Sequence, residues 1–130
     1  MAKYLILKKR RDFLKAAKDT TFVTHHVVIQ AAFCAEKKDE ALPRIGFTAT
    51  KKIGKAFYRN RTKRRLRAVV REIEQRTFLN GVDYVFVGRR DTGYCPYEKL
   101  KNGAEWALKK INSELKNKLK EHEKNPDSAD

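Results

Sequence analysis

The spacing of apolar residues changes along this chain from every second residue to every third or fourth, and this change restricts it to a mixed α and β fold. Residues 44–50 alternate between apolar and small or polar side chains, as in a strand with one packed face. Residues 22–34 contain Val, Ile and Thr but no Gly or Pro, which also predicts extended structure. Residues 56–79 instead carry an apolar stripe at helical spacing, made of Leu66, Val69, Val70 and Ile73.

Three further elements complete the predicted order. Asp12 is a candidate N-cap for a short helix over residues 13–17. Residues 82–88 predict a strand, and Pro96 is expected at the first position of a last helix. We predict the order α-β-β-β-α-β-α, with three strands between the first two helices. This order favours an α+β or α/β sandwich in which helices pack on a single sheet.

The length of 130 residues predicts one domain. We expect this domain to span residues 1–115, because residues 116–130 form a charged tail that we expect to fray. No apolar run reaches the roughly 18 residues that a membrane span needs, and residues 4–7 are too short for a signal peptide. We therefore expect a cytoplasmic protein without a membrane partner, in which Cys34 and Cys95 are reduced thiols.

Positive charge is concentrated in one part of the chain. The formal net charge is +15, yet no acidic residue lies between Glu40 and Glu72, and ten bases lie between Lys51 and Arg71. A helix face that contacts only water usually interleaves both signs. On a helix over residues 56–79, one flank beside the apolar stripe would carry Asn60, Lys63, Arg64, Arg67 and Arg71. This clustering predicts contact with the phosphates of a nucleic acid.

The residues needed for side-chain catalysis are not arranged in any readable pattern. The chain has no Ser/His/Asp or Cys/His signature, no phosphate-binding glycine loop and no carboxylate pair. His25 and His26 are adjacent, so on a strand they would point to opposite faces and could not bind one metal ion together. We therefore expect no metal bound directly by the protein and no chemistry carried out by its own side chains.

A long motif within the basic segment resembles the signature of bacterial ribonuclease P proteins. Residues 51–67 read KKIGKAFYRNRTKRRLR and are similar to the family's K-x-G-x-A segment followed by R-N-R-x-K-R. Residues 7–13, 44–50 and 97–100 resemble other elements of the family in the same order. The similarity covers about residues 5–115.

The resemblance implies a protein subunit of a ribonucleoprotein endonuclease. The catalytic RNA, with Mg²⁺ bound mainly by that RNA, would cleave precursor tRNA to make the mature 5′ end. The protein would bind this RNA one to one and would also bind the 5′ leader of the substrate. The family further implies a left-handed β-α-β crossover carrying the basic helix, whereas about 98% of such crossovers are right-handed.

The resemblance also assigns residues to two contact surfaces. The catalytic RNA would contact Lys51, Lys52, Arg59, Asn60, Arg61, Lys63, Arg64 and Arg67, to which the charge pattern adds Lys55 and Arg71. The leader would pass through a cleft between the first helix and the sheet, at Phe13, Gln30 and Thr48.

Phe13 has two interpretations, because a leader base could stack on it or it could be a core residue of an amphipathic helix. This chain has Ala17 where many relatives have a second bulky aromatic residue, and Gln30 where some relatives have Tyr. Stacking would be weaker, so leader binding would depend more on charge.

Three other functions agree with parts of the pattern. A ribosomal or other structural RNA-binding protein would share the charge but not the ordered match. A helix-turn-helix DNA-binding protein would need a short helix before residues 56–79, where the sequence predicts a strand. A stand-alone nuclease would need acid, base or metal ligands on a common element.

Overall fold

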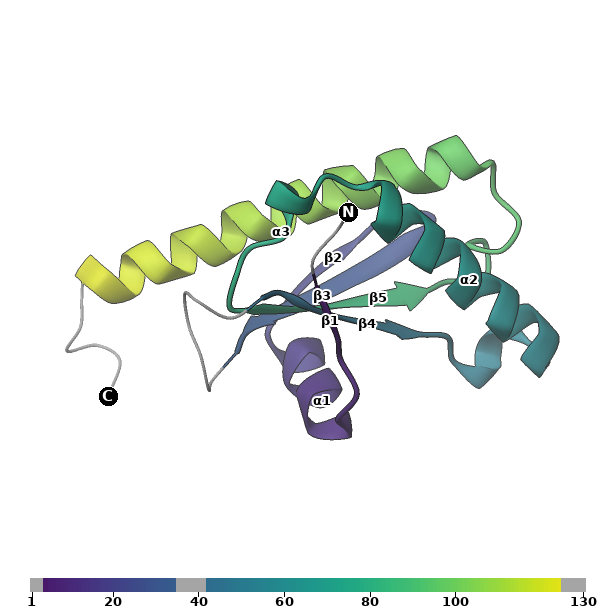
Figure 1. The fold of residues 1–130 in the computed structure, drawn as a ribbon, viewed down its shortest axis with the longest axis horizontal. Helices are drawn as coiled ribbons and strands as arrows, with labels where there is room; N and C mark the ends of the chain where they lie inside the picture. The colour runs from purple at the N-terminus through teal and green to yellow at the C-terminus, as the bar shows by residue number, and fades with distance from the viewer. Residues whose placement is uncertain (1–3, 35–41, 125–130) are drawn as a thin grey trace.

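The computed structural model describes residues 4–34 and 42–124, which form one mixed sheet and three α-helices (Figure 1). In chain order these elements are β1 (Leu5–Ile6), α1 (Arg10–Lys18), β2 (Thr20–Val23), β3 (Val27–Phe33), β4 (Arg44–Thr48), α2 (Ala56–Glu72), β5 (Val82–Gly88) and α3 (Tyr97–Lys124). Two short 3₁₀ turns, η1 (Lys51–Ile53) and η2 (Gln75–Thr77), precede and follow α2.

The five strands lie in the order β1-β4-β5-β3-β2, with β5 in the middle. β4 pairs in parallel with both β1 and β5, whereas β3 pairs antiparallel with β5 and β2. α1 lies on one face of this sheet, and α2 and α3 lie on the other (Figure 1). The predicted α+β fold, with helices packed on a single sheet, is confirmed.

The main core lies between the sheet and the layer of α2 and α3. Alternate residues of β5, including Tyr84 and Phe86, point into it and are fully buried. The predicted stripe of α2 is also buried there, from Leu66 to Ile73. Fully burying such a side chain stabilises the fold by roughly 1.5–3 kcal/mol, so the stripe determines which side of α2 faces the sheet.

A smaller core lies under α1 on the opposite face of the sheet. It contains Leu7, Ala16, Ala32 and Val85, with Phe13 partly buried against it. Because these residues are few and mostly small, α1 has less apolar contact with the sheet than α2 and α3 have.

An ion-pair cluster connects α1 to the two central parallel strands. Arg44 donates from Nε and Nη2 to the carboxylate of buried Asp83, at 2.7 and 2.6 Å. The Nη1 atom of Arg44 lies 3.4 Å from Asp12 Oδ2 on α1. The hydrogen bond to Asp83 holds the pKa of Arg44 above its ordinary value. The prediction that Asp12 caps the first helix is therefore wrong. α1 begins at Arg10 with Lys9 as its N-cap residue, and the Asp12 carboxylate pairs with Arg44 instead.

The segment predicted as extended over residues 22–34 contains a turn, which divides it into β2 and β3. β2 ends at Val23, and the hydroxyl of Thr24 donates to the Val27 carbonyl and accepts from the Val27 amide, at 2.8 and 3.1 Å. This local bonding reverses the chain at residues 24–26 without Gly or Pro, which explains why the sequence pattern did not show it.

The second helix is shorter than the predicted 56–79, because α2 ends at Glu72. The next positions of its stripe would be Arg76 and Thr77, so a further helical turn would bury no large apolar side chain. Phe78 reaches the main core from beyond η2 instead.

The last helix is longer than expected. We expected fraying from about residue 116, whereas α3 continues to Lys124. Lys118 lies beyond Leu115, the last apolar residue that the structure describes as buried. The Lys118 Nζ atom contacts Asp19 Oδ1 at 3.2 Å and Thr20 Oγ1 at 2.6 Å. The boundary of the domain at residue 115 stays a prediction, and residues 125–130 lie outside the described part of the chain. Among the described helices, none combines the length and apolar character of a membrane span.

Candidate nucleic-acid interface

The flank of α2 beside its buried stripe is exposed and strongly basic. Asn60, Arg64, Arg67 and Arg71 are exposed, and Lys63 is half-buried. The guanidinium of Arg67 lies 5.7 Å from the centre of the Phe47 ring, a cation–π contact that holds this side chain against β4. The burial of the stripe on one side thus presents a row of cations on the neighbouring side.

The chain leading into α2 adds three more cations. Lys51 and Lys52 lie on η1, Lys55 is the N-cap residue of α2, and all three are exposed. Gly54 between them has a φ of 136°, a conformation that favours glycine. The first turn of α2 has no acidic residue, so its unpaired N–H groups and these lysines together suit an anion. We call this set the basic surface: Lys51, Lys52, Lys55, Asn60, Lys63, Arg64, Arg67 and Arg71.

Two arginines of the motif donate hydrogen bonds within the protein, and a third has a buried nitrogen atom. Arg65 donates from Nη1 to the Thr92 carbonyl and from Nη2 to the Cys95 carbonyl, both at 2.7 Å. Arg61 donates from Nε to the Gly93 carbonyl at 3.0 Å. The Nε atom of Arg59 is buried and has no hydrogen-bond partner among the described residues. Arg61 and Arg65 therefore anchor the loop of residues 89–95 to α2, a role that the count of bases could not reveal.

The three residues predicted to contact the leader share the α1 side of the sheet. The Phe13 ring lies directly over Gly46, where an added Cβ would be 2.6 Å from Phe13 Cζ. Gly46 on β4 pairs with Val85 on β5, and Val85 pairs with Gln30 on β3. Gln30 therefore lies two strands from Gly46 in the same row, at a backbone separation of about 10 Å. Thr48 is two residues beyond Gly46 on β4.

α1 leaves part of this sheet face uncovered. A row that runs across the strands from Thr48 through Val87 and Val28 to Val23 is partly or wholly exposed. Phe13 is half-buried and lies between this open row and the small core under α1. The burial of Phe13 thus agrees with both interpretations, a packed residue and a ring with one accessible side.

The expectation for the two adjacent histidines is wrong. His25 and His26 lie in the turn between β2 and β3 rather than on a strand, and both face Asp91. His26 Nδ1 contacts Asp91 Oδ2, and His25 Nε2 is 3.8 Å from the same oxygen. One ligand atom from each of the three residues lies within 4.8 Å of the others, so the group could hold a metal ion. A turn brings together side chains that a strand would separate.

The basic surface itself does not fit a Mg²⁺ site. Mg²⁺ prefers oxygen ligands and is usually held by one or two carboxylates, but residues 41–71 include no Asp or Glu.

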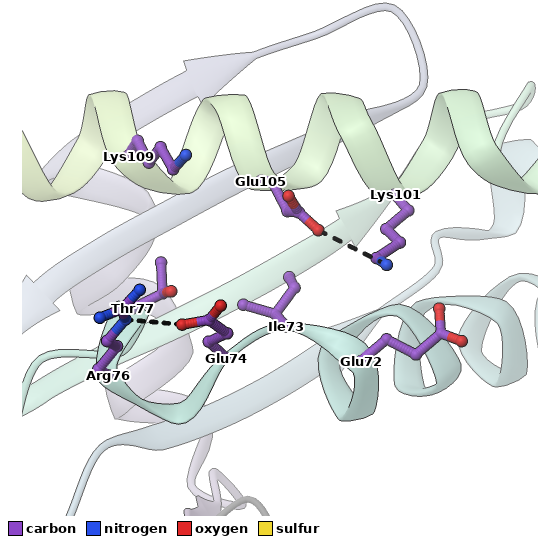
Figure 2. Close-up of a pocket in the computed structure, with 8 residues that line it drawn as sticks. All are labelled: Glu72, Ile73, Glu74, Arg76, Thr77, Lys101, Glu105 and Lys109. Atoms are coloured by element: carbon purple, nitrogen blue, oxygen red, sulfur yellow. Dashed lines mark ion pairs between the residues drawn. The ribbon is translucent and has the colours of Figure 1, made fainter.

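A hollow between the end of α2 and α3 is separate from both predicted contact surfaces. It is lined by Glu72, Ile73, Glu74, Arg76, Thr77, Lys101, Glu105 and Lys109 (Figure 2). Its charged side chains partly pair with one another, Arg76 with Glu74 at 2.6 Å and Lys101 with Glu105 at 3.9 Å. Because acidic and basic groups are mixed, this hollow offers no selective attraction for a polyanion.

The fold and the basic surface define a class of small α+β proteins suited to a polyanionic partner. Comparisons with known proteins identify the family. A family model described as Ribonuclease P matches residues 1–112. The ribonuclease P protein component of Gluconacetobacter diazotrophicus is 49% identical over 86 residues, which cover 66% of this chain and 72% of that protein. The ribonuclease P protein component of Ruegeria pomeroyi is 38% identical over 109 residues, which cover 83% of this chain and 86% of that protein.

A solved structure supports the same fold. The RNase P protein of Staphylococcus aureus has a TM-score of 0.66 at 23% identity, covering 82% of this chain and 94% of that one. The chain therefore belongs to the ribonuclease P protein family, as its motif predicted, and is a component of a tRNA-processing ribonucleoprotein.

Proposed function

We propose that this chain binds the catalytic RNA of ribonuclease P through the basic surface and holds the 5′ leader of precursor tRNA on the α1 side of the sheet. It thereby assists endonucleolytic removal of the leader in the cytoplasm. The RNA subunit, with Mg²⁺ that it mainly binds itself, carries out phosphodiester hydrolysis, and one protein binds one RNA.

The single observation that carries this proposal is the acid-free, exposed flank of α2. Aligned cations such as Lys63, Arg67 and Arg71 repel one another unless phosphates neutralise them. Binding to RNA removes this repulsion and releases condensed counterions, which contributes a large favourable free energy to binding at a phosphate-contacting surface. Arg59 and Arg61 join this interface through the parts of their guanidinium groups that do not bind the protein.

The leader site is supported by the half-buried Phe13 beside an exposed strip of sheet. A single strand of variable sequence is best held by stacking and by nearby charge, which tolerate any base. Gln30 and Thr48 offer hydrogen-bonding groups on the same face. Because the leader site and the basic surface lie on opposite faces of the sheet, the protein can contact both RNAs at once.

The β4–α2–β5 unit joins two parallel neighbouring strands through the basic helix. We propose that this crossover is left-handed, as in the family. An experimentally determined structure of this chain with a right-handed crossover would contradict it.

Reconstitution with the ribonuclease P RNA of the same genome tests the proposed function. We expect the protein alone to cleave nothing, and the protein with RNA to cleave precursor tRNA at a Mg²⁺ concentration at which the RNA alone is slow. Mature tRNA serves as the control ligand, since it lacks the leader. The proposal would be refuted if the protein does not change the rate at which the RNA cleaves precursor tRNA. It would also be refuted if the protein alone cleaves and this activity depends on one of its acidic or His residues.

A further inference from the structure

Three aromatic side chains lie exposed beside one another where α2 begins. Phe57 is 67% exposed, Tyr94 60% and Tyr58 39%. The ring centres of Phe57 and Tyr58 are 5.4 Å apart with the planes at 85°, and those of Tyr58 and Tyr94 are 6.1 Å apart at 45°. Phe57 and Tyr58 come from α2 and Tyr94 from the loop of residues 89–95, so only the folded chain assembles this cluster.

Packing in the two hydrophobic cores does not account for these rings. None of the three belongs to the main core or to the small core under α1. Exposed aromatic rings give up the hydrophobic stabilisation that their large surfaces would gain by burial. Three such rings in contact therefore indicate a surface that is covered when a partner binds.

The surroundings of the cluster are basic and held in place. The Arg61 guanidinium lies 5.7 Å from the centre of the Tyr94 ring while its Nε atom donates to the Gly93 carbonyl. Arg65 fixes the same loop through the Thr92 and Cys95 carbonyls. Lys55, a member of the basic surface, lies two residues before Phe57. An aromatic platform pre-organised by arginines suits a ligand that combines a flat ring with a negative charge.

We propose that Phe57, Tyr58 and Tyr94 form a stacking platform for an unpaired base of the catalytic RNA. This inference rests on the proposed function. It adds a stacking contact with the flat face of a base to a surface that otherwise binds RNA through cations. Base stacking on aromatic rings is the usual way in which proteins hold unpaired nucleotides. The platform is distinct from Phe13, which lies with α1 on the opposite face of the sheet.

Truncation of the rings tests the platform with binding to the ribonuclease P RNA as the readout. Phe57→Ala and Tyr94→Ala should each weaken binding by about 5- to 150-fold, the range for loss of one base–aromatic stack. The slope of log affinity against log salt should stay that of the wild type, because a stacked base neutralises no phosphate. Trp106→Ala is the matched control, since Trp106 on α3 is 51% exposed but lies outside the platform, and its affinity should not change.

A second set of variants separates stacking from simple apolar contact and does not depend on truncation. Phe57→Leu keeps apolar bulk without a π face and should bind RNA as weakly as Phe57→Ala. Phe57→Trp should bind at least as well as wild type. In a Trp106→Phe background the introduced indole is the only one of the chain, and stacking should quench its fluorescence when RNA is added.

The outcomes distinguish failure of the platform from failure of the proposed function. If the wild type binds the RNA and supports cleavage, but the Ala and Leu variants bind equally well and the introduced indole is not quenched, the platform is refuted and the function stands. If the wild type does not bind this RNA, both proposals fail. Equal quenching by a fully double-stranded RNA, which offers no unpaired base, would also refute the platform.

Discussion

Substitution of Phe13 can distinguish the contact with the leader from the contact with the catalytic RNA. Its ring lies against Gly46, half-buried at the edge of the open row on the sheet. We expect Phe13→Ala to weaken binding of precursor tRNA to the holoenzyme by about 1–3 kcal/mol, the range for one stacked base. Binding of mature tRNA and assembly with the catalytic RNA should be nearly unchanged, and affinity measurements on the three RNAs check this.

The neighbouring Leu14 provides the control for this variant. Leu14 is also on α1 and is 48% exposed, so Leu14→Ala should leave all three affinities unchanged. If Phe13 is instead needed mainly for packing, its truncation should cost roughly 3–5 kcal/mol of fold stability. A large fall in melting temperature with equal loss of every RNA contact would therefore contradict the stacking role.

Arg65 illustrates a residue whose role depends on geometry more than on charge. Its guanidinium bridges two carbonyls of the loop of residues 89–95, which lysine cannot reproduce with a single ammonium group. Arg65→Lys keeps the charge, so we expect little change in the salt dependence of RNA binding. We expect faster hydrogen exchange of the Tyr94 and Cys95 amides, both of which donate to the Asp91 carbonyl. Unchanged exchange at these amides would show that the loop does not depend on Arg65.

At the scale of the helix, α2 should behave as an electrostatic surface. Each phosphate neutralised on a single strand contributes about −0.7 to the slope of log affinity against log salt. Replacing Arg64 and Arg67 together by Ala should flatten this slope by about one to two units, with roughly one contact per arginine. Binding titrations at several salt concentrations measure it.

Two bases outside the basic surface make a matched control for the double variant. Arg76 and Lys109 line the hollow between the end of α2 and α3, where charges of both signs are mixed (Figure 2). Their joint replacement by Ala removes the same charge and should leave the slope as in the wild type. Equal flattening in both double variants would mean that only net charge matters, not its position.

The elements that the sequence could predict are those with long local patterns. β5 covers residues 82–88 as predicted, because a run of apolar residues is bounded by a turn on each side. The buried stripe of α2 was also predictable, since it repeats over two helical turns. β1 was not predicted, because two residues cannot show a period of two. The end of α2 was misjudged because Phe78 extends the apolar character of the segment but reaches the core from outside the helix.

The candidate site was predictable as a set of charges but not as a set of contacts. Ten bases without an acid indicate a phosphate-binding helix from sequence alone. The bonds from Arg61 and Arg65 to the loop join residues far apart in the chain, and no local pattern encodes such contacts. The approach of Asp91 to His25 and His26 likewise depends on a turn and on a loop that meet only in the folded chain.

At the scale of the whole molecule, Tyr84 connects the sheet to α3 and to the segment that follows α2. Its hydroxyl donates to Asn112 Oδ1 on α3 at 2.6 Å and accepts from the Leu79 amide at 2.9 Å. The Asn112 side chain in turn donates to the Thr77 carbonyl at 2.6 Å. We expect Tyr84→Phe to cost about 1–3 kcal/mol at neutral pH, because it leaves buried polar groups unpaired.

The same residue should make stability depend on alkaline pH. Burial raises the pKa of Tyr84, so the folded state favours the neutral phenol. The stabilisation is complete below about pH 10, the ordinary tyrosine pKa, and is lost as the pH rises from there towards the raised value. Denaturant unfolding between about pH 7 and pH 11, a range that brackets the ordinary tyrosine pKa, should show a steeper decline for the wild type than for Tyr84→Phe. Parallel curves would contradict this linkage.

The central position of β5 has a consequence for how the chain folds during synthesis. β3 and β4 are not neighbours in the sheet, and each depends on β5, which follows the whole basic helix in sequence. A nascent chain that has not yet reached residue 82 therefore lacks the strand that joins β3 to β4, and the apolar stripe on α2 has no complete sheet to pack against. Such late closure by long-range contacts slows folding, so the partly folded chain exposes the apolar stripe of α2 until the last strand pairs.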